Sequence, residues 1–271
     1  VNIILNYIFI YGNFGAPELE VFGAGLSTFF VGICETIIFF IIFLKKGILS
    51  FRYTIFDISL IKRAFKVGIP TGVERFFTFL SLMLITKFIA SYSVEALAGY
   101  QTGLRAEGIA YMPGIGFMVA SMVLIGQSIG AKDVEEGYKG VKTASFLSSV
   151  FMGSIGLVMI IFDYEIAKIF TTDIDAIVEI ARYLEIIGYS QIPLAMVFVY
   201  DGGLRGAGAT KLTFIVNTTT IWLIRVLPIY ILSTYKVSIE YIYWMIVLET
   251  FIRGLVLKTL FDKGYWRDIK V

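Results

Sequence analysis

The sequence contains no histidine, and Cys34 is its only cysteine among 271 residues. Without these side chains the chain has no His or Cys ligands for zinc, no Ser/His/Asp triad and no disulfide framework. Charge is also scarce, because Asp, Glu, Lys and Arg together make up only 16% of the residues. These absences exclude most classes of enzyme, and we predict that the protein is not an enzyme.

Apolar residues, by contrast, are abundant. They make up 58% of the chain, and the mean hydropathy is +0.83. This is more apolar surface than a soluble domain of this length buries, so a lipid bilayer is the expected surrounding. The formal net charge is only +2, and the basic residues form short clusters. We therefore expect a protein of the cell (inner) membrane without a nucleic-acid partner.

The apolar residues gather in runs that are long enough to cross a bilayer, which takes roughly 20 residues of helix. One run is partial, Val1–Ile10, and the full ones are Val21–Leu44, Val67–Ala90, Ala96–Gly126, Thr143–Phe162, Ile177–Tyr200, Leu212–Ser233 and Ile239–Phe261. Each full run is too long for a strand, and a helix satisfies its own backbone groups in lipid. The pattern predicts an all-α polytopic membrane protein.

A long basic connection, 45–66, divides these runs into one and a half helices before it and six after it. We interpret 1–44 as the end of a first lobe (a partial helix 5 and helix 6) and 45–66 as a cytoplasmic interlobe linker. Residues 67–262 would form a second six-helix lobe, and 263–271 a cytoplasmic tail. The first residues carry no initiator Met, basic stretch or cleavage site, which indicates a truncated chain rather than a signal peptide.

Lysine and arginine residues are distributed unevenly over the connections. If the connections alternate across the membrane, one side holds Lys87, Lys168 and Lys236 and the other holds 15 basic residues. Cytoplasmic loops carry such an excess of positive charge. The asymmetry places the C terminus in the cytoplasm.

Several short motifs occur in a fixed order along the chain. They are Gly15–Thr28, Gly68–Glu74, Ala96–Gln101, Met112–Phe117, Leu124–Lys132, Gly203–Thr210, Arg225–Pro228 and Gly264–Trp266. Each motif is weak by itself. The series with its spacings resembles the second lobe of MATE (multidrug and toxic compound extrusion) transporters, preceded by the end of their first lobe.

This resemblance implies one half of a twelve-helix antiporter with two six-helix lobes and alternating access. Influx of Na⁺ or H⁺ would drive export of small organic cations and drugs, without another cofactor. The rest of the first lobe, with a cation site of its own in several members, would be a partner outside this chain. The alternative is a flippase of the same superfamily for lipid-linked oligosaccharides or peptidoglycan precursors, in which arginines usually converge on the cavity.

Charged residues inside the runs are the candidates for transport, because each costs roughly 2.5–3.5 kcal/mol on insertion scales. A carboxylate that faces a hydrated cleft can bind Na⁺, exchange a proton or attract a cationic drug. The candidates are Glu74, Glu107 and Asp201, each of which could hold Na⁺, and Glu35 of the first lobe. The acidic residues that NorM-type members carry near Thr78 and at Leu194 are absent here, so coupling is expected to rest on the missing lobe or on Glu74, Glu107 and Asp201.

Three further residues complete the predicted binding site. Gln101 shares a helix with Glu107, and Tyr100 could stack on a cation. Arg225 is expected to be buried against a carboxylate from another helix, for which Asp201 and Glu107 are the suggested partners.

Other charged residues have a structural interpretation. Arg182 with Glu185, and Glu249 with Arg253, have the spacing of ion pairs on one helix face. Arg205 lies at a helix end and is interpreted as a cytoplasmic anchor, with a phosphate anchor or an interlobe ion pair as the alternatives.

Overall fold

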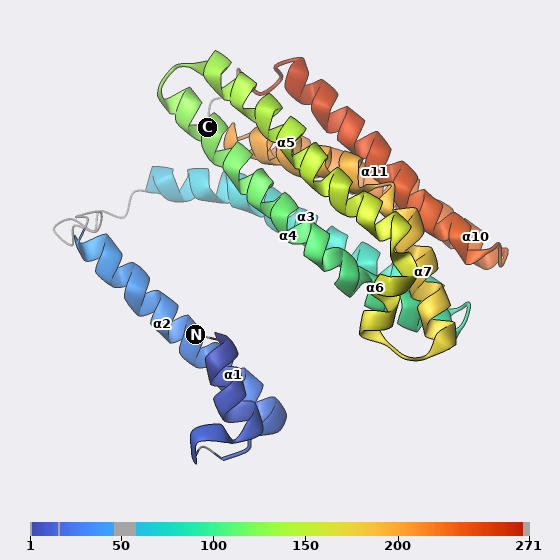
Figure 1. The fold of residues 1–271 in the computed structure, drawn as a ribbon. Coiled ribbons are helices and arrows are strands. Elements are labelled where there is room, and N and C mark those ends of the chain that lie inside the picture. The colour runs from blue at the N-terminus through green and yellow to red at the C-terminus, as the bar shows by residue number, and fades with distance from the viewer. Residues whose placement is uncertain (1, 16, 46–57, 268–271) are drawn as a thin grey trace. The chain divides into compact units, whose positions relative to one another are not determined.

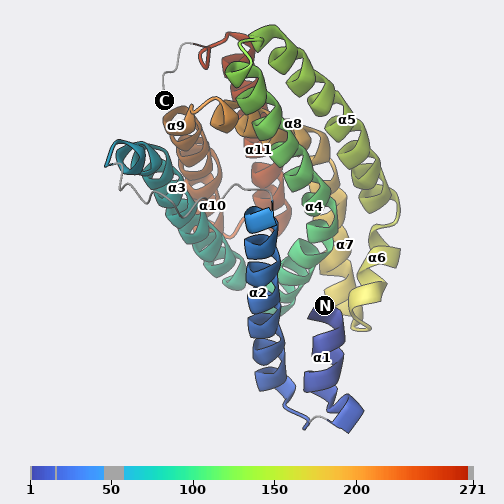
Figure 2. The ribbon, with the colours of Figure 1, turned by 90° about the vertical axis from the view of Figure 1, so that its left-hand side faces the viewer.

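A computed structural model describes residues 2–15, 17–45 and 58–267. The chain divides into two compact units, Val1–Ile58 and Ser59–Val271. The first unit contains α1 (Asn2–Tyr11), a short 3₁₀ turn η1 (Asn13–Gly15) and α2 (Glu20–Lys45), with α1 beside the first part of α2 (Figure 2). Gly23 permits this contact, because a Cβ atom there would lie 2.3 Å from the carbonyl oxygen of Phe9.

The regular secondary structure in the described residues of the second unit is helical (Figure 1). Its elements are α3 (Ile58–Ala90), α4 (Val94–Gly130), α5 (Val134–Ile161), α6 (Asp163–Phe170), α7 (Ile174–Gly188), α8 (Gln191–Gly206), α9 (Thr210–Thr220), the π-helical turn η2 (Ile221–Val226), α10 (Leu227–Thr234) and α11 (Ile239–Asp262). The long helices α4 and α5 run alongside each other in both views, and α8 packs against both.

Four helices in the described residues are long and apolar enough to cross a membrane: α2, α4, α5 and the continuous segment Thr210–Thr234. The pair α7 and α8 is a fifth if it is counted as one span. The helices α3 and α11 have 33 and 24 residues and carry charged side chains within their length. The predicted all-helical membrane architecture is confirmed at this level.

Two details differ from the expected runs. The helix α3 begins at Ile58, so residues 58–66 of the predicted linker are helical, and 46–57 lie outside the described residues. The short helix α6 follows the run that was expected to end at Phe162.

The predicted run Ile177–Tyr200 is helical but not one continuous helix, because it consists of two helices, α7 and α8, that meet at 57°. The bend lies at Tyr189 and Ser190, where α7 closely approaches α5: a Cβ atom on Gly188 would lie 2.8 Å from the carbonyl oxygen of Gly156. Pro193 sits in the first turn of α8, where its missing N–H leaves no hydrogen bond unmade.

A π-helical turn interrupts the run that was predicted over 212–233. Pro228 has no N–H to donate to the carbonyl four residues earlier, and the N–H of Leu227 donates to the carbonyl of Trp222 with i→i+5 spacing. Such turns occur frequently at functional sites. Arg225 belongs to this turn.

Glycines on one face of α8 bring it against the backbone of α4. A Cβ atom on Gly202 would lie 2.2 Å from the carbonyl oxygen of Met118, and one on Gly206 would lie 2.3 Å from that of Met122. Glycines spaced by four residues allow this close packing of membrane helices. Gly208 follows with φ +81° and ends the helix.

Candidate functional site

A cavity of about 330 Å³ lies inside the second unit, between α3, α4, α7, α8, η2 and α11. We call it the Glu107 cavity. Its polar lining consists of Thr78, Ser81, Tyr100, Glu107, Tyr111, Tyr183, Ser190, Arg225, Thr250 and Arg253. Thr78 and Leu194 also line it, so the two positions discussed above for NorM-type members face the same cavity.

Glu107 reaches this cavity from α4 and is held by neutral donors. The hydroxyl of Tyr183 donates to Glu107 Oε2 at 2.7 Å, and Gln191 Nε2 donates to Oε1 at 3.5 Å. One turn earlier, Gly103 makes room for the Tyr183 ring, because a Cβ atom there would lie 2.3 Å from the ring carbon Cδ1. Among the described residues, no lysine or arginine forms an ion pair with Glu107.

Three buried tyrosines pack beside Glu107. Tyr183 meets Tyr100 and Tyr243 edge to face, with ring centroids 5.6 Å and 5.2 Å apart. Tyr100 and Tyr243 are stacked at 6.4 Å. Each of these residues is 2% exposed or less; Tyr100 and Tyr183 line the cavity, and Tyr243 of α11 packs against both from outside it.

Two arginines that line the cavity, Arg225 and Arg253, share one carboxylate. Glu249 is fully buried and pairs with Arg225 from η2 and with Arg253, whose Nε lies 3.2 Å from Glu249 Oε1. Arg225 also donates to Thr250 Oγ1 at 3.1 Å. The predicted pair of Glu249 and Arg253 is confirmed. Arg225 was predicted to be buried against a carboxylate of another helix, and this is confirmed, but the carboxylate is Glu249 of α11 and neither Asp201 nor Glu107.

A second buried group of charges joins α3, α8 and α9, and we call it the Arg205 cluster (Glu74, Asp201, Arg205 and Asn217). Arg205 Nε lies 2.5 Å from Asp201 Oδ2, and its Nη2 donates to both carboxylate oxygens of Glu74 at 2.6 and 2.7 Å. Asn217 Nδ2 donates at 2.9 Å to each of the two carboxylates. The side chain of Arg205 is 12% exposed, so it is held by ion pairs inside the second unit and does not stand free at the helix end.

The residues predicted from the sequence thus separate into groups. Tyr100, Glu107 and Arg225 line one cavity, and Glu74 and Asp201 share Arg205. Gln101 points to the exposed face of α4, and Glu35 is exposed on α2 of the first unit. The sequence interpretation missed Tyr183, Gln191, Asn217 and Thr250, for which no short-range pattern exists. The i,i+4 spacing of Asp201 and Arg205 is a signal that could have revealed that pair.

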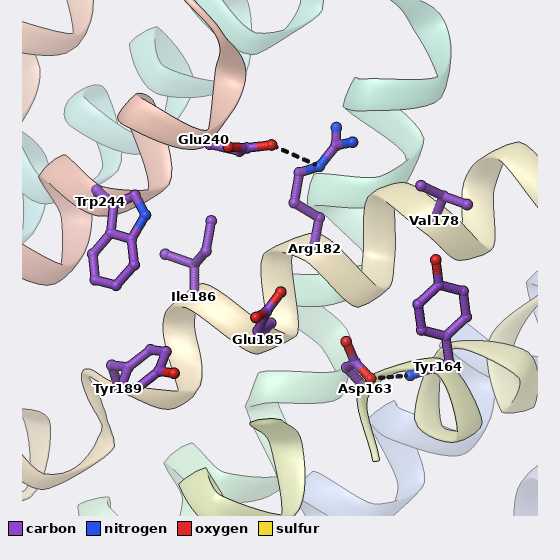
Figure 3. A pocket seen from close by; sticks show the side chains of 9 residues that line it. All are labelled: Asp163, Tyr164, Val178, Arg182, Glu185, Ile186, Tyr189, Glu240 and Trp244. Atoms are coloured by element: carbon purple, nitrogen blue, oxygen red, sulfur yellow. Dashed lines mark hydrogen bonds and ion pairs between the residues drawn. The ribbon is translucent and has the colours of Figure 1, made fainter. Parts of the chain in front are cut away.

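A second cavity, of about 350 Å³, opens where α6, α7 and the start of α11 meet (Figure 3). We call it the Arg182 pocket. Arg182 pairs with Glu179 at 2.6 Å and with Glu240 at 3.3 Å, so the predicted pair with Glu185 was wrong. Tyr189 and Trp244 stack in its wall with ring centroids 5.6 Å apart.

Long apolar helices that bury several charged residues against one another define a multi-pass membrane protein. The MatE family model matches residues 70–231. Because this match covers more than half of the sequence, the chain belongs to the MatE family.

Curated relatives and solved structures agree with this assignment. The probable multidrug resistance protein NorM of Thermotoga maritima is 31% identical over 245 residues, which are 87% of this chain and 51% of that protein. The NorM protein of Bacillus anthracis is 29% identical over 256 residues, covering 90% of this chain and 55% of that protein. The chain therefore spans about half the length of the curated relatives it matches.

Among solved structures, the fold matches the MATE transporter VcmN of Vibrio cholerae with a TM-score of 0.87 at 20% identity, covering 98% of this chain and 61% of that one. A MOP superfamily transporter from Pyrococcus furiosus gives a TM-score of 0.86 at 17% identity, with 98% and 60% covered. At these identities the similarity establishes the fold alone.

Proposed function

We propose that this chain forms the second lobe of a cation-coupled antiporter that exports small organic cations by alternating access. The coupling ion is Na⁺ or H⁺, and the other lobe belongs to the same longer polypeptide. The protein lies in the cell (inner) membrane, and its C terminus faces the cytoplasm. The observation that carries the proposal is the state of Glu107, a carboxylate that lines a cavity and is held by neutral donors.

The other buried carboxylates already have cationic partners. Glu249 is neutralised by two arginines, while Glu74 and Asp201 share Arg205. A cation that binds to any of these must compete with a guanidinium, and breaking a buried pair is costly. At Glu107 a proton, Na⁺ or an organic ammonium group can add charge without breaking an ion pair. This difference makes Glu107 the site at which coupling ion and substrate exclude each other.

The rest of the cavity suits a small organic cation. Its volume of about 330 Å³ lies at the lower end of the roughly 300–1,000 Å³ that small-molecule pockets span. The rings of Tyr100 and Tyr111 line it beside Glu107 and can take part in cation–π contacts.

A flippase for lipid-linked precursors is the second candidate, because Arg225 and Arg253 line the same cavity. A pyrophosphate group would need guanidinium groups free to bind it bidentately. Both arginines are paired with Glu249, which favours the antiporter.

Ethidium transport into everted vesicles, the direction that corresponds to efflux from the cell, tests the proposal, with the full-length protein that contains this chain and with Na⁺ and H⁺ gradients imposed separately. One gradient should drive efflux, and Glu107→Gln should abolish it because the neutral amide binds neither ion. Glu95→Gln, an exposed carboxylate on the same helix, is the matched control and should keep wild-type efflux. If neither gradient moves the dye, the antiporter proposal fails and the flippase takes its place.

A further inference from the structure

The Arg182 pocket has walls from three helices, and each wall contributes a carboxylate together with an aromatic ring (Figure 3). The three pairs are Glu185 with Tyr189 on α7, Glu240 with Trp244 on α11, and Asp163 with Tyr164 at the start of α6. The first two pairs have i,i+4 spacing, which puts both side chains on the same face of their helix. The same combination of groups thus occurs three times around one cavity of about 350 Å³.

The carboxylates of the pocket outnumber its cations. Of the described residues that line it, Arg182 alone is basic, and it already pairs with Glu179 and Glu240. Neither Asp163 nor Glu185 has an ion pair in the described part of the chain. Glu185 lies about three turns into α7, where a charge without a partner is costly and is a functional candidate by default. Negative charge therefore remains for a ligand to neutralise.

The aromatic rings give the pocket a second means of holding a cation. Tyr189 and Trp244 stack with ring centroids 5.6 Å apart and 29° between their planes, and Tyr164 lies across the pocket from them in Figure 3. All three residues are close to half exposed, so part of each ring is open to a ligand. Aromatic faces attract cations, and quaternary ammonium ligands are recognised in this way. Rings that were only interfacial anchors would not need to share one cavity with three carboxylates.

We propose that the Arg182 pocket binds an organic ammonium group between the carboxylates of Asp163 and Glu185 and the stacked rings of Tyr189 and Trp244. The cavity volume of about 350 Å³ lies at the lower end of the range for small-molecule pockets, which suits an ammonium group with short substituents. Two sources carry this group: a free organic cation, and the headgroup of an aminolipid such as phosphatidylethanolamine.

This site is separate from the Glu107 cavity, because no described residue lines both. Glu240 lies in the first turn of α11, so the pocket is at the end of that helix opposite to the C terminus. The proposal goes beyond the antiporter function and does not depend on it, since the carboxylates and rings of the pocket are present whichever ion Glu107 binds.

Saturation-transfer NMR with tetramethylammonium tests the site, on purified full-length protein in nanodiscs and with empty nanodiscs as the blank. Glu107→Gln is the background, because it removes the unpaired carboxylate of the other cavity. In this background we expect Glu185→Gln to weaken binding about tenfold, equivalent to about 1.4 kcal/mol. Trp244→Leu should weaken it about fivefold through loss of a cation–π contact.

The matched controls are Glu165→Gln on α6 and Tyr241→Leu on α11, two exposed residues outside the pocket. Both should bind tetramethylammonium as the background does. Equal binding in Glu185→Gln, Trp244→Leu and these controls would overturn the ammonium site, whatever the result at Glu107. Absence of gradient-driven ethidium transport would overturn the antiporter and leave this site standing.

The lipid composition of the nanodiscs separates the two sources of the ammonium group. Phosphatidylethanolamine is replaced with a neutral glycolipid at a constant fraction of phosphatidylglycerol. If the lipid headgroup occupies the pocket, this exchange removes a competitor and tightens tetramethylammonium binding in the background but not in Glu185→Gln. If the ligand is a free organic cation, the affinity for tetramethylammonium stays the same in both lipid mixtures.

Discussion

The Arg205 cluster contains one cation for two carboxylates, and this imbalance predicts an asymmetric response to substitution. Arg205→Gln leaves Glu74 and Asp201 as two buried negative charges that share the amide of Asn217. Removing one partner of a buried pair in this way costs about 3–5 kcal/mol of the free energy of unfolding.

Glu74→Gln removes one of the two negative charges and leaves Arg205 paired with Asp201 at 2.5 Å. The loss is limited to charge-assisted hydrogen bonds, about 1.5–3 kcal/mol. The order of the two effects, with Arg205→Gln the more destabilising, follows from the charge count and not from the number of contacts.

Unfolding in mixed detergent and SDS micelles measures both variants on one scale. Arg105→Gln, an exposed arginine on α4, is the control and should change the free energy of unfolding little. If Glu74→Gln destabilises the protein as much as Arg205→Gln, the cluster is not held by charge balance, and the reasoning is wrong.

Two further outcomes are expected in the same unfolding assay. Gly206→Ala should destabilise the protein by about 1–3 kcal/mol through overpacking against the carbonyl of Met122, whereas Gly108→Ala, with open space around it, should be neutral. Glu249→Gln leaves two guanidinium groups without a counter-charge and should cost about 3–5 kcal/mol, so stability equal to wild type would show that the two arginines are hydrated instead.

Hydropathy alone predicted most of the helices, because lipid imposes both the length and the apolar character of a span. The break in the run 177–200 escaped this approach. The helices on either side of Gly188, Tyr189 and Ser190 are together apolar enough to count as one span, and the bend depends on the approach of α7 to Gly156 in α5. The sequence signal near this point is Pro193, which was not used.

The charged residues of the candidate site could be predicted from the sequence, but their ion-pair partners could not. The cost of burying charge drew attention to Glu74, Glu107, Asp201 and Arg225. Which arginine neutralises which carboxylate depends on contacts between helices far apart in sequence, such as Arg205 with Glu74. The role of Glu107 became distinct only when the other carboxylates were found to be paired.

The central claim is that Glu107 is the site at which the coupling ion and the organic cation compete. The most direct measurement is equilibrium binding of ethidium to the purified full-length protein over a range of pH and of Na⁺ concentration. The account predicts that one of the two ions weakens ethidium binding in the wild type and in Glu95→Gln, and that this competition disappears in Glu107→Gln. Undiminished competition in Glu107→Gln would contradict it and move the coupling site elsewhere.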